Sequence, residues 1–87
     1  MVDLLIDEPS RPFERIGRVA AKGALHAFES RTTKARFLQE RLREEAEQMR
    51  ADAVINVTVA TEGVIGRRRI VVRGVAIRYT NGPGSGR

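Results

Sequence analysis

Three consecutive arginines have the most distinctive chemistry in this sequence. Arg67, Arg68 and Arg69 are followed by Arg73, and residues 63–87 contain six arginines and no acidic residue. Guanidinium groups bind phosphate and carboxylate oxygens in a bidentate fashion, so these four arginines are a candidate anion site. No aromatic residues interleave with them, so any contact with nucleic acid should be to the backbone and sensitive to salt. The alternative is that these charges protect a strand edge from aggregation.

The residues that usually bind transition metals are nearly absent. The chain has no cysteine, and His26 is its single histidine. A transition-metal site needs several Cys, His or carboxylate ligands at defined spacing, and only Glu29 stands near His26. No Ser/His/Asp set, cysteine nucleophile or phosphate loop ahead of a helix is visible either. We therefore expect no metal site, no cofactor and no enzymatic activity.

The length and composition predict one small domain that needs a partner. The chain has 87 residues, of which 41% are apolar, and it has no disulfide to support a small core. Small domains of this kind often gain stability from a second subunit. No segment reads as a secretory signal or a membrane span, which predicts a cytoplasmic protein. We expect a single domain over residues 1–80 and a flexible tail over residues 81–87.

The alternation of apolar and polar residues predicts the order strand, strand, helix, strand, strand. Strands are expected over residues 2–6, 15–25, 53–61 and 69–79, and one helix over residues 34–50. In the helix, apolar residues recur at steps of three and four, and Ser30, Thr32 and Thr33 are candidate N-caps. This pattern indicates a two-layer α+β fold, in which one helix packs on a face of the sheet.

The last strand is apolar on both faces, and this feature predicts self-association. We assign to the helix-covered face Val71, Val75 and Ile77, together with Ile55, Val57 and Val59 of the preceding strand. The opposite face of the last strand then carries Ile70, Val72, Gly74 and Ala76. One helix covers only one face, and an exposed apolar strip usually marks an interface. We therefore expect this second set to lie in a homo-oligomer interface.

Four segments, taken in order along the chain, resemble the YbjQ-like family. They are Pro12-Phe13-Glu14-Arg15-Ile16-Gly17, residues 42–46, residues 51–57 and residues 74–77. The family consists of small bacterial proteins, often labelled heavy-metal-binding, with a dodecin-like subunit fold. The resemblance spans roughly residues 12–80. It implies a curved antiparallel sheet with one helix on a face, assembled as a ring-like and often pentameric homo-oligomer. It implies no established enzymatic activity.

Two features of this chain depart from the family pattern. Family members usually have Gly before Ala51-Asp52-Ala53, where the end of the helix needs a left-handed residue. Here that position is Arg50, which should cost on the order of 1 kcal/mol unless the helix ends differently. The second departure is the lack of cysteine and the single histidine, which give the metal label no support.

These observations predict a non-enzymatic, homo-oligomeric structural or binding module. Two alternatives stay open: an anion or nucleic-acid-backbone binder that uses the Arg67–Arg69 hairpin, and a small-ligand carrier with a pocket between subunits. Dodecin-like assemblies bind flavin between subunits by stacking on an aromatic residue. Tyr79 is the strand aromatic that this chain offers, and a flavin site is not favoured.

Overall fold

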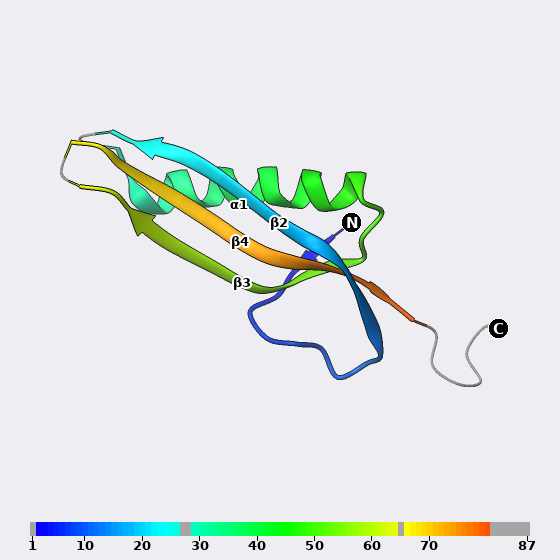
Figure 1. The fold of residues 1–87 in the computed structure, drawn as a ribbon. Helices are drawn as coiled ribbons and strands as arrows, with labels where there is room; N and C mark the ends of the chain where they lie inside the picture. The colour runs from blue at the N-terminus through cyan, green and yellow to red at the C-terminus, as the bar shows by residue number, and fades with distance from the viewer. Residues whose placement is uncertain (1, 27–28, 65, 81–87) are drawn as a thin grey trace.

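The computed structural model describes residues 2–26, 29–64 and 66–80 as one sheet with one helix packed on it (Figure 1). Its elements are β1 (Asp3–Leu4), β2 (Phe13–Leu25), α1 (Arg31–Gln48), β3 (Ala53–Glu62) and β4 (Arg68–Tyr79). The predicted α+β fold and the predicted order of elements are confirmed. The tail expected over residues 81–87 lies outside the described residues.

The four strands form one sheet in the order β1-β3-β4-β2. β2 and β3 both run antiparallel to the central strand β4, whereas β1 pairs in parallel with the start of β3. The sheet is therefore mixed, and the expectation of a wholly antiparallel sheet needs this correction. The reason is the chain path: residues 5–12 lead from β1 at one edge of the sheet to β2 at the other edge.

The helix contains the predicted apolar stripe but begins at Arg31 rather than at residue 34, because Ser30, one of the three candidate caps, is its N-cap. The Ser30 hydroxyl accepts a hydrogen bond from the N–H of Thr33 at 3.2 Å, which caps the first turn. Its buried residues Leu38, Leu42 and Ala46 face the sheet. The helix lies mainly over β2 and β4 and contacts β3 less (Figure 1).

The helix ends through a left-handed residue at Arg50, which is the first of the two outcomes that the sequence left open. Arg50 has φ of 60°, and its N–H donates to the carbonyl of Glu47 at 2.9 Å. The N–H of Ala51 donates to the carbonyl of Ala46 at 3.0 Å, which completes a Schellman motif. The guanidinium of Arg78 on β4 donates to the Arg50 carbonyl at 3.2 Å, so the end of the helix is tied to the sheet.

A bulge in β3 changes which of its side chains face the helix. β3 carries one extra residue relative to β4 at Asn56, whose φ is 55°. Val54 before the bulge, and Val57 and Val59 after it, pack in the core beneath α1. Ile55 belongs instead to a small cluster on the opposite face. The prediction that Ile55 shares a face with Val57 and Val59 is therefore wrong, because the bulge reverses the alternation.

The two faces of β4 are also the reverse of the prediction. The helix covers the set expected in an oligomer interface, and its members Ile70, Val72 and Ala76 are fully buried in the core with Leu42. The fourth member, Gly74, faces the same way, because a side chain added there would meet Val54. Small residues on β2 explain why the helix packs on this face. Gly17 lies beneath Met49 and Gly23 beneath Leu38, and the lack of side chains there lets the helix approach the sheet closely.

On the opposite face of the sheet, Val71 is buried in the middle of β4, and a second segment of the described chain packs on the sheet at one end. There, Ala53, Ile55 and Ile77 are buried together, and Leu5 and Phe13 pack on them. The connection between β1 and β2 thus shields this end of the sheet. The remainder of this face, between the middle of β2 and the hairpin after β3, is where the exposed polar residues gather.

Candidate functional site

The uncovered part of the sheet carries a cluster of cations, which we call the basic face. Its four cations are Arg18 and Lys22 on β2 and Arg69 and Arg73 on β4. One acid, Glu62 on β3, lies on the same face. Because Ile70 and Val72 point toward α1, the alternate residues of β4 point away from it. Cross-strand partners share a face, and Arg18 pairs with Val75, Lys22 with Val71, and Glu62 with Arg69.

The basic face holds more positive charge than its one acid can balance. Glu62 contacts both Arg69 at 3.4 Å and Arg73 at 3.1 Å. Arg18 and Lys22 take part in none of the ion pairs found among residues 2–26, 29–64 and 66–80. Four cations therefore face one carboxylate, and the side chains of Arg69 and Arg73 remain about half exposed to solvent.

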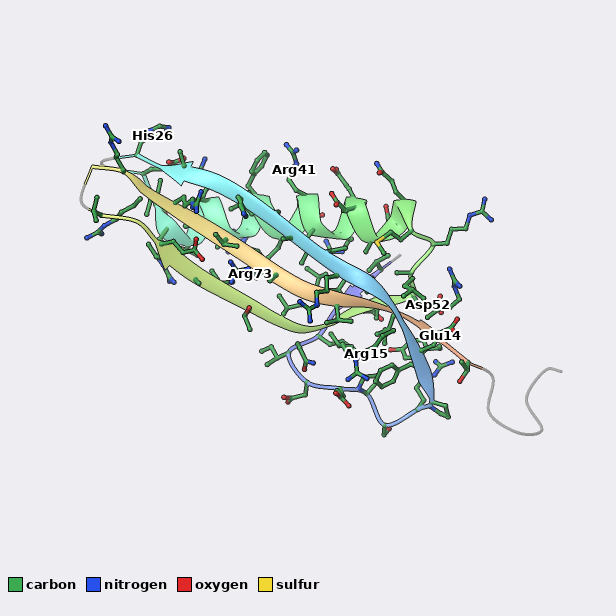
Figure 2. All side chains as sticks on the ribbon, in the orientation of Figure 1. Glu14, Arg15, His26, Arg41, Asp52 and Arg73 are labelled. Carbon is green, nitrogen blue, oxygen red and sulfur yellow. The ribbon has the colours of Figure 1, made fainter. Side chains whose placement is uncertain are left out.

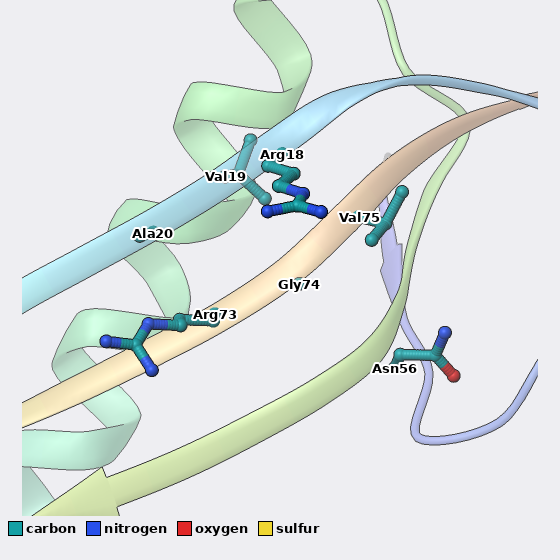
Figure 3. Close-up of a pocket in the computed structure, with 7 residues that line it drawn as sticks. All are labelled: Arg18, Val19, Ala20, Asn56, Arg73, Gly74 and Val75. Atoms are coloured by element: carbon teal, nitrogen blue, oxygen red, sulfur yellow. The ribbon is translucent and has the colours of Figure 1, made fainter.

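A hollow of about 460 Å³ lies in the middle of this face (Figure 3). Its lining residues are Arg18, Val19, Ala20, Asn56, Arg73, Gly74 and Val75. The Arg18 side chain points from β2 toward β4, whereas the Arg73 side chain extends along β4 in the direction away from Arg18. Arg18 pairs with Val75, two residues beyond Arg73, so the two arginines are diagonal neighbours whose Cα atoms lie about 7–8 Å apart.

The structure divides the four arginines predicted to form an anion site. Arg69 and Arg73 belong to the basic face. Arg68 pairs with Leu25, which packs against the core on the helix side, and Arg67 precedes the strand. A second hollow of about 400 Å³ is lined by Lys22, Gly23, Ala24, Arg67, Arg68 and Arg69. The consecutive arginines therefore border one shared depression without pointing to the same face of the sheet.

Sequence reasoning missed Arg18, Lys22 and Asn56. A signal for the first two was present, because Arg18, Ala20 and Lys22 alternate with Val19 and Ala21 in a pattern typical of a strand with one solvated face. No local pattern marks Asn56, which depends on the pairing of β3 with β4. These residues come together with Arg73 only through the register of the sheet.

The carboxylates and the histidine do not converge on a metal site. No group of three His, Cys, Asp or Glu side chains able to hold a metal occurs within the described part of the chain. Figure 2 shows His26 at one end of the molecule, whereas Glu14 and Asp52 lie near the other end. Glu29, the carboxylate nearest to His26 in the sequence, is engaged in other contacts.

The contacts of Glu29 explain its charge. Its carboxylate accepts the backbone N–H of His26 at 2.9 Å and contacts the Lys34 ammonium at 3.1 Å. Two hydrogen bonds lower the pKa of Glu29 below its usual value. The bond from the His26 N–H has the larger effect, and the bond from Lys34 has the next largest. Glu29 thus stabilises the turn before α1 as a carboxylate.

Two stretches of strand edge have no partner within the described chain. One is the outer edge of β2, since β2 pairs only with β4. The other is the outer edge of β3 over residues 58–62, because the pairing on that side ends where the Val57 N–H donates to the Leu5 carbonyl at 3.0 Å. Phe37 on α1 lies near the β2 edge and is 56% exposed. Near the β3 edge, Val59 is only half-buried.

Comparison with known proteins identifies the family. The sequence model of a family described as putative heavy-metal-binding matches residues 13–80. The chain belongs to the YbjQ family. This match confirms the resemblance found in the sequence. The family's description mentions heavy-metal binding, but the described residues of this chain contain no cluster of side chains that could hold a metal ion. Among curated proteins, none matches the sequence.

A solved structure shares the fold of this YbjQ family member. It is the crystal structure of a protein of unknown function, assigned to the DUF74 family, from Pediococcus pentosaceus. The two chains are 20% identical, with a TM-score of 0.65, and the similarity covers 91% of this chain and 98% of that one. Neither the description of the family nor that of the Pediococcus protein indicates catalysis. In addition, no helix in the described ranges is long and apolar enough to cross a bilayer.

Proposed function

We propose that the protein is a non-enzymatic module that assembles into a homo-oligomeric ring, with β2 of one copy pairing with β3 of the next. The observation that carries this proposal is the pair of unpaired strand edges on opposite sides of the sheet. Unpaired edges readily bind another strand, and proteins usually cover or block them. The outer edge of β2 is long, since β2 runs from Phe13 to Leu25.

The side chains beside the two edges complement each other. α1 lies mainly over β2 and β4, which leaves Val57 and Val59 of β3 half-buried on the helix side. Phe37 stands on α1 near the β2 edge. If β2 of one copy extends the sheet beyond β3 of the next, Phe37 of the first copy lies in the same layer as these valines. The contact would then bury apolar surface that a single copy leaves in water.

This contact joins two different surfaces, and that fact favours a ring. A head-to-tail contact closes into a ring when the rotation between copies permits it, and the twist of a sheet supplies such a rotation. The ring-like, often pentameric assembly implied by the resemblance to the YbjQ family agrees with this geometry. Unlike the strip expected from the sequence, the proposed contact leaves Ile70, Val72, Gly74 and Ala76 inside each subunit.

Light scattering after gel filtration tests the assembly. At micromolar concentration the protein should have a mass several times 9.7 kDa. Phe37→Glu should give folded monomers, and so should Val59→Lys, whose aliphatic stem can still lie along the sheet. Gln48→Glu is the matched control, because it adds a negative charge at the exposed far end of the same helix. A wild-type particle of 9.7 kDa would contradict the proposal.

Mixing the two monomeric variants tests the head-to-tail contact itself. Each variant keeps one unaltered surface, so the mixture should form a 1:1 complex through one native contact. The mixture should also stop at this 1:1 complex, because its two outer surfaces are the altered ones, whereas the wild type continues into a ring. If both variants fold and the mixture stays monomeric, the head-to-tail arrangement is wrong.

A second candidate function is binding of a nucleic-acid backbone by the hairpin. It is favoured by the hollow that Lys22 and Arg67, Arg68 and Arg69 share. Binding of a labelled oligonucleotide should then weaken steeply between low and moderate salt, roughly in proportion to the phosphates neutralised. It should disappear when the three arginines are changed to Gln. Sequence-selective binding that survives high salt would contradict this function.

A further inference from the structure

We propose that the hollow between Arg18 and Arg73 binds a small organic phosphate. The phosphate would lie between the two guanidinium groups, and the organic part would rest on Ala20 and Val75. This site is distinct from the hairpin hollow and needs only one copy of the chain. The proposed phosphate site therefore does not depend on the formation of the ring.

The charges around the hollow favour an anion there. Arg18 and Arg73 are diagonal neighbours on one face of the sheet, so two positive charges border the same hollow. Arg18 has no acidic partner in the described part of the chain, and the one acid of the basic face, Glu62, contacts Arg73 and Arg69 instead. A dianion between the two arginines would balance their charge and could accept hydrogen bonds from both planar guanidiniums.

The floor of the hollow suits an apolar group. Ala20 is exposed and Val75 half-buried, and both line the hollow, where Ala20 pairs with Arg73 and Val75 pairs with Arg18. A volume of about 460 Å³ is larger than inorganic phosphate requires and falls within the range of small-molecule sites, roughly 300–1,000 Å³. No aromatic residue lines the hollow, so a stacked nucleobase has no platform. The chemistry therefore favours a phosphate monoester with a compact apolar body.

The bulge places a polar group at the far end of the same hollow. Asn56 is exposed, and its amide lies across β4 from Arg18 (Figure 3). Bulges often re-aim a side chain beside a functional site. The amide can donate to or accept from a polar substituent on the ligand, which would orient the organic part relative to the phosphate.

Glu62 is a built-in competitor for this site. Its carboxylate accepts a hydrogen bond from the Arg73 guanidinium at 3.1 Å, and Arg73 extends away from Arg18 (Figure 3). A phosphate in the hollow must draw Arg73 from this contact or share it. Removing the charge of Glu62 should therefore strengthen binding, an outcome that simple damage to the sheet would not produce.

Titration of the full chain with phenyl phosphate, followed by amide NMR shifts or calorimetry, tests the proposal. Phenyl phosphate should bind at least several-fold more tightly than inorganic phosphate, and benzyl alcohol should not saturate the site. Arg18→Gln and Arg73→Gln should each weaken binding by about tenfold, since each removes charge-assisted hydrogen bonds. Glu62→Gln should strengthen it by a few-fold. Arg36→Gln on the exposed surface of α1 is the control and should change nothing.

Three results would overturn the proposal. The first is equal affinity for phenyl phosphate in the wild type and in both arginine variants, with folding confirmed by circular dichroism. The second is equal affinity for phenyl phosphate and inorganic phosphate, which would mean that no organic group is recognised. The third is saturable binding only of a polyanion, lost on changing Arg67, Arg68 and Arg69 to Gln, which would place the anion site at the hairpin. Unchanged phenyl phosphate binding by the monomeric Phe37→Glu variant would support a site within one chain.

Discussion

Changing Arg50 to glycine should stabilise the protein, because Arg50 holds a backbone conformation that glycine adopts without strain. Its φ of 60° lies in the left-handed region. A residue with a side chain pays about 1–2 kcal/mol there. Glycine avoids this cost but loses more backbone entropy on folding, roughly 0.4–1 kcal/mol. The net gain expected for Arg50→Gly is therefore about 0.5–1 kcal/mol.

The hydrogen bonds around Arg50 do not oppose this gain. The motif uses backbone groups: the N–H of Arg50 donates to Glu47, and its carbonyl accepts from Arg78 at 3.2 Å. Glycine keeps both groups. The Arg50 side chain is exposed and forms none of the ion pairs within the described residues. Only the conformational cost should change.

Thermal and urea unfolding, followed by circular dichroism, measure the effect. For a domain of this size the gain corresponds to a rise in Tm of about 2–8 °C. Arg50→Ala is the matched control, since it removes the same side chain but keeps a Cβ in the left-handed region. All variants must be compared at one subunit concentration, because assembly makes Tm depend on concentration. If Arg50→Gly were no more stable than Arg50→Ala, the strain argument would be refuted.

Three further changes have defined outcomes. Val72→Glu places a charge in the fully buried core and should destabilise the fold by about 3–5 kcal/mol, whereas Glu47→Lys on the exposed side of α1 should leave the Tm nearly unchanged. The lowered pKa of Glu29 means that its carboxylate stabilises the fold above pH 4.5, and that this stabilisation is lost as the pH falls through the folded-state pKa. The free energy of unfolding should therefore depend less on pH in this range in Glu29→Gln than in the wild type. Thermal melts with and without a strong chelator should coincide, and a drop of several degrees would show that a metal stabilises the fold.

The elements of the fold could be predicted because each has a local cause. The helix follows from the spacing of Leu38, Leu42 and Ala46 and from the cap at Ser30. For the end of α1, the resemblance to the family indicated a left-handed residue at position 50, and the structure selects this ending over the alternative. These features depend on residues within one or two turns of each other, and such short-range signals are visible in a sequence.

The faces of the sheet could not be predicted because they depend on pairing between distant strands. Both faces of β4 are apolar, so alternation alone does not say which one meets the helix. The extra residue at Asn56 reverses the alternation within β3, and nothing in the neighbouring residues announces it. The candidate site was missed for the same reason. Consecutive arginines point to alternate faces of a strand, whereas Arg18 and Arg73 are brought together by the register of β2 with β4.

The order of strands in the sheet has a consequence for synthesis on the ribosome. β1 pairs with β3 and β2 pairs with β4, so neither N-terminal strand has its partner when it emerges. Only α1, whose hydrogen bonds are local, can form early. Phe13 pairs with Tyr79, so β2 stays open until β4 is complete, with its apolar residues available to other nascent chains. A chain that stops before β4 would have the helix but only the short β1–β3 pairing, so such fragments should aggregate rather than fold in part.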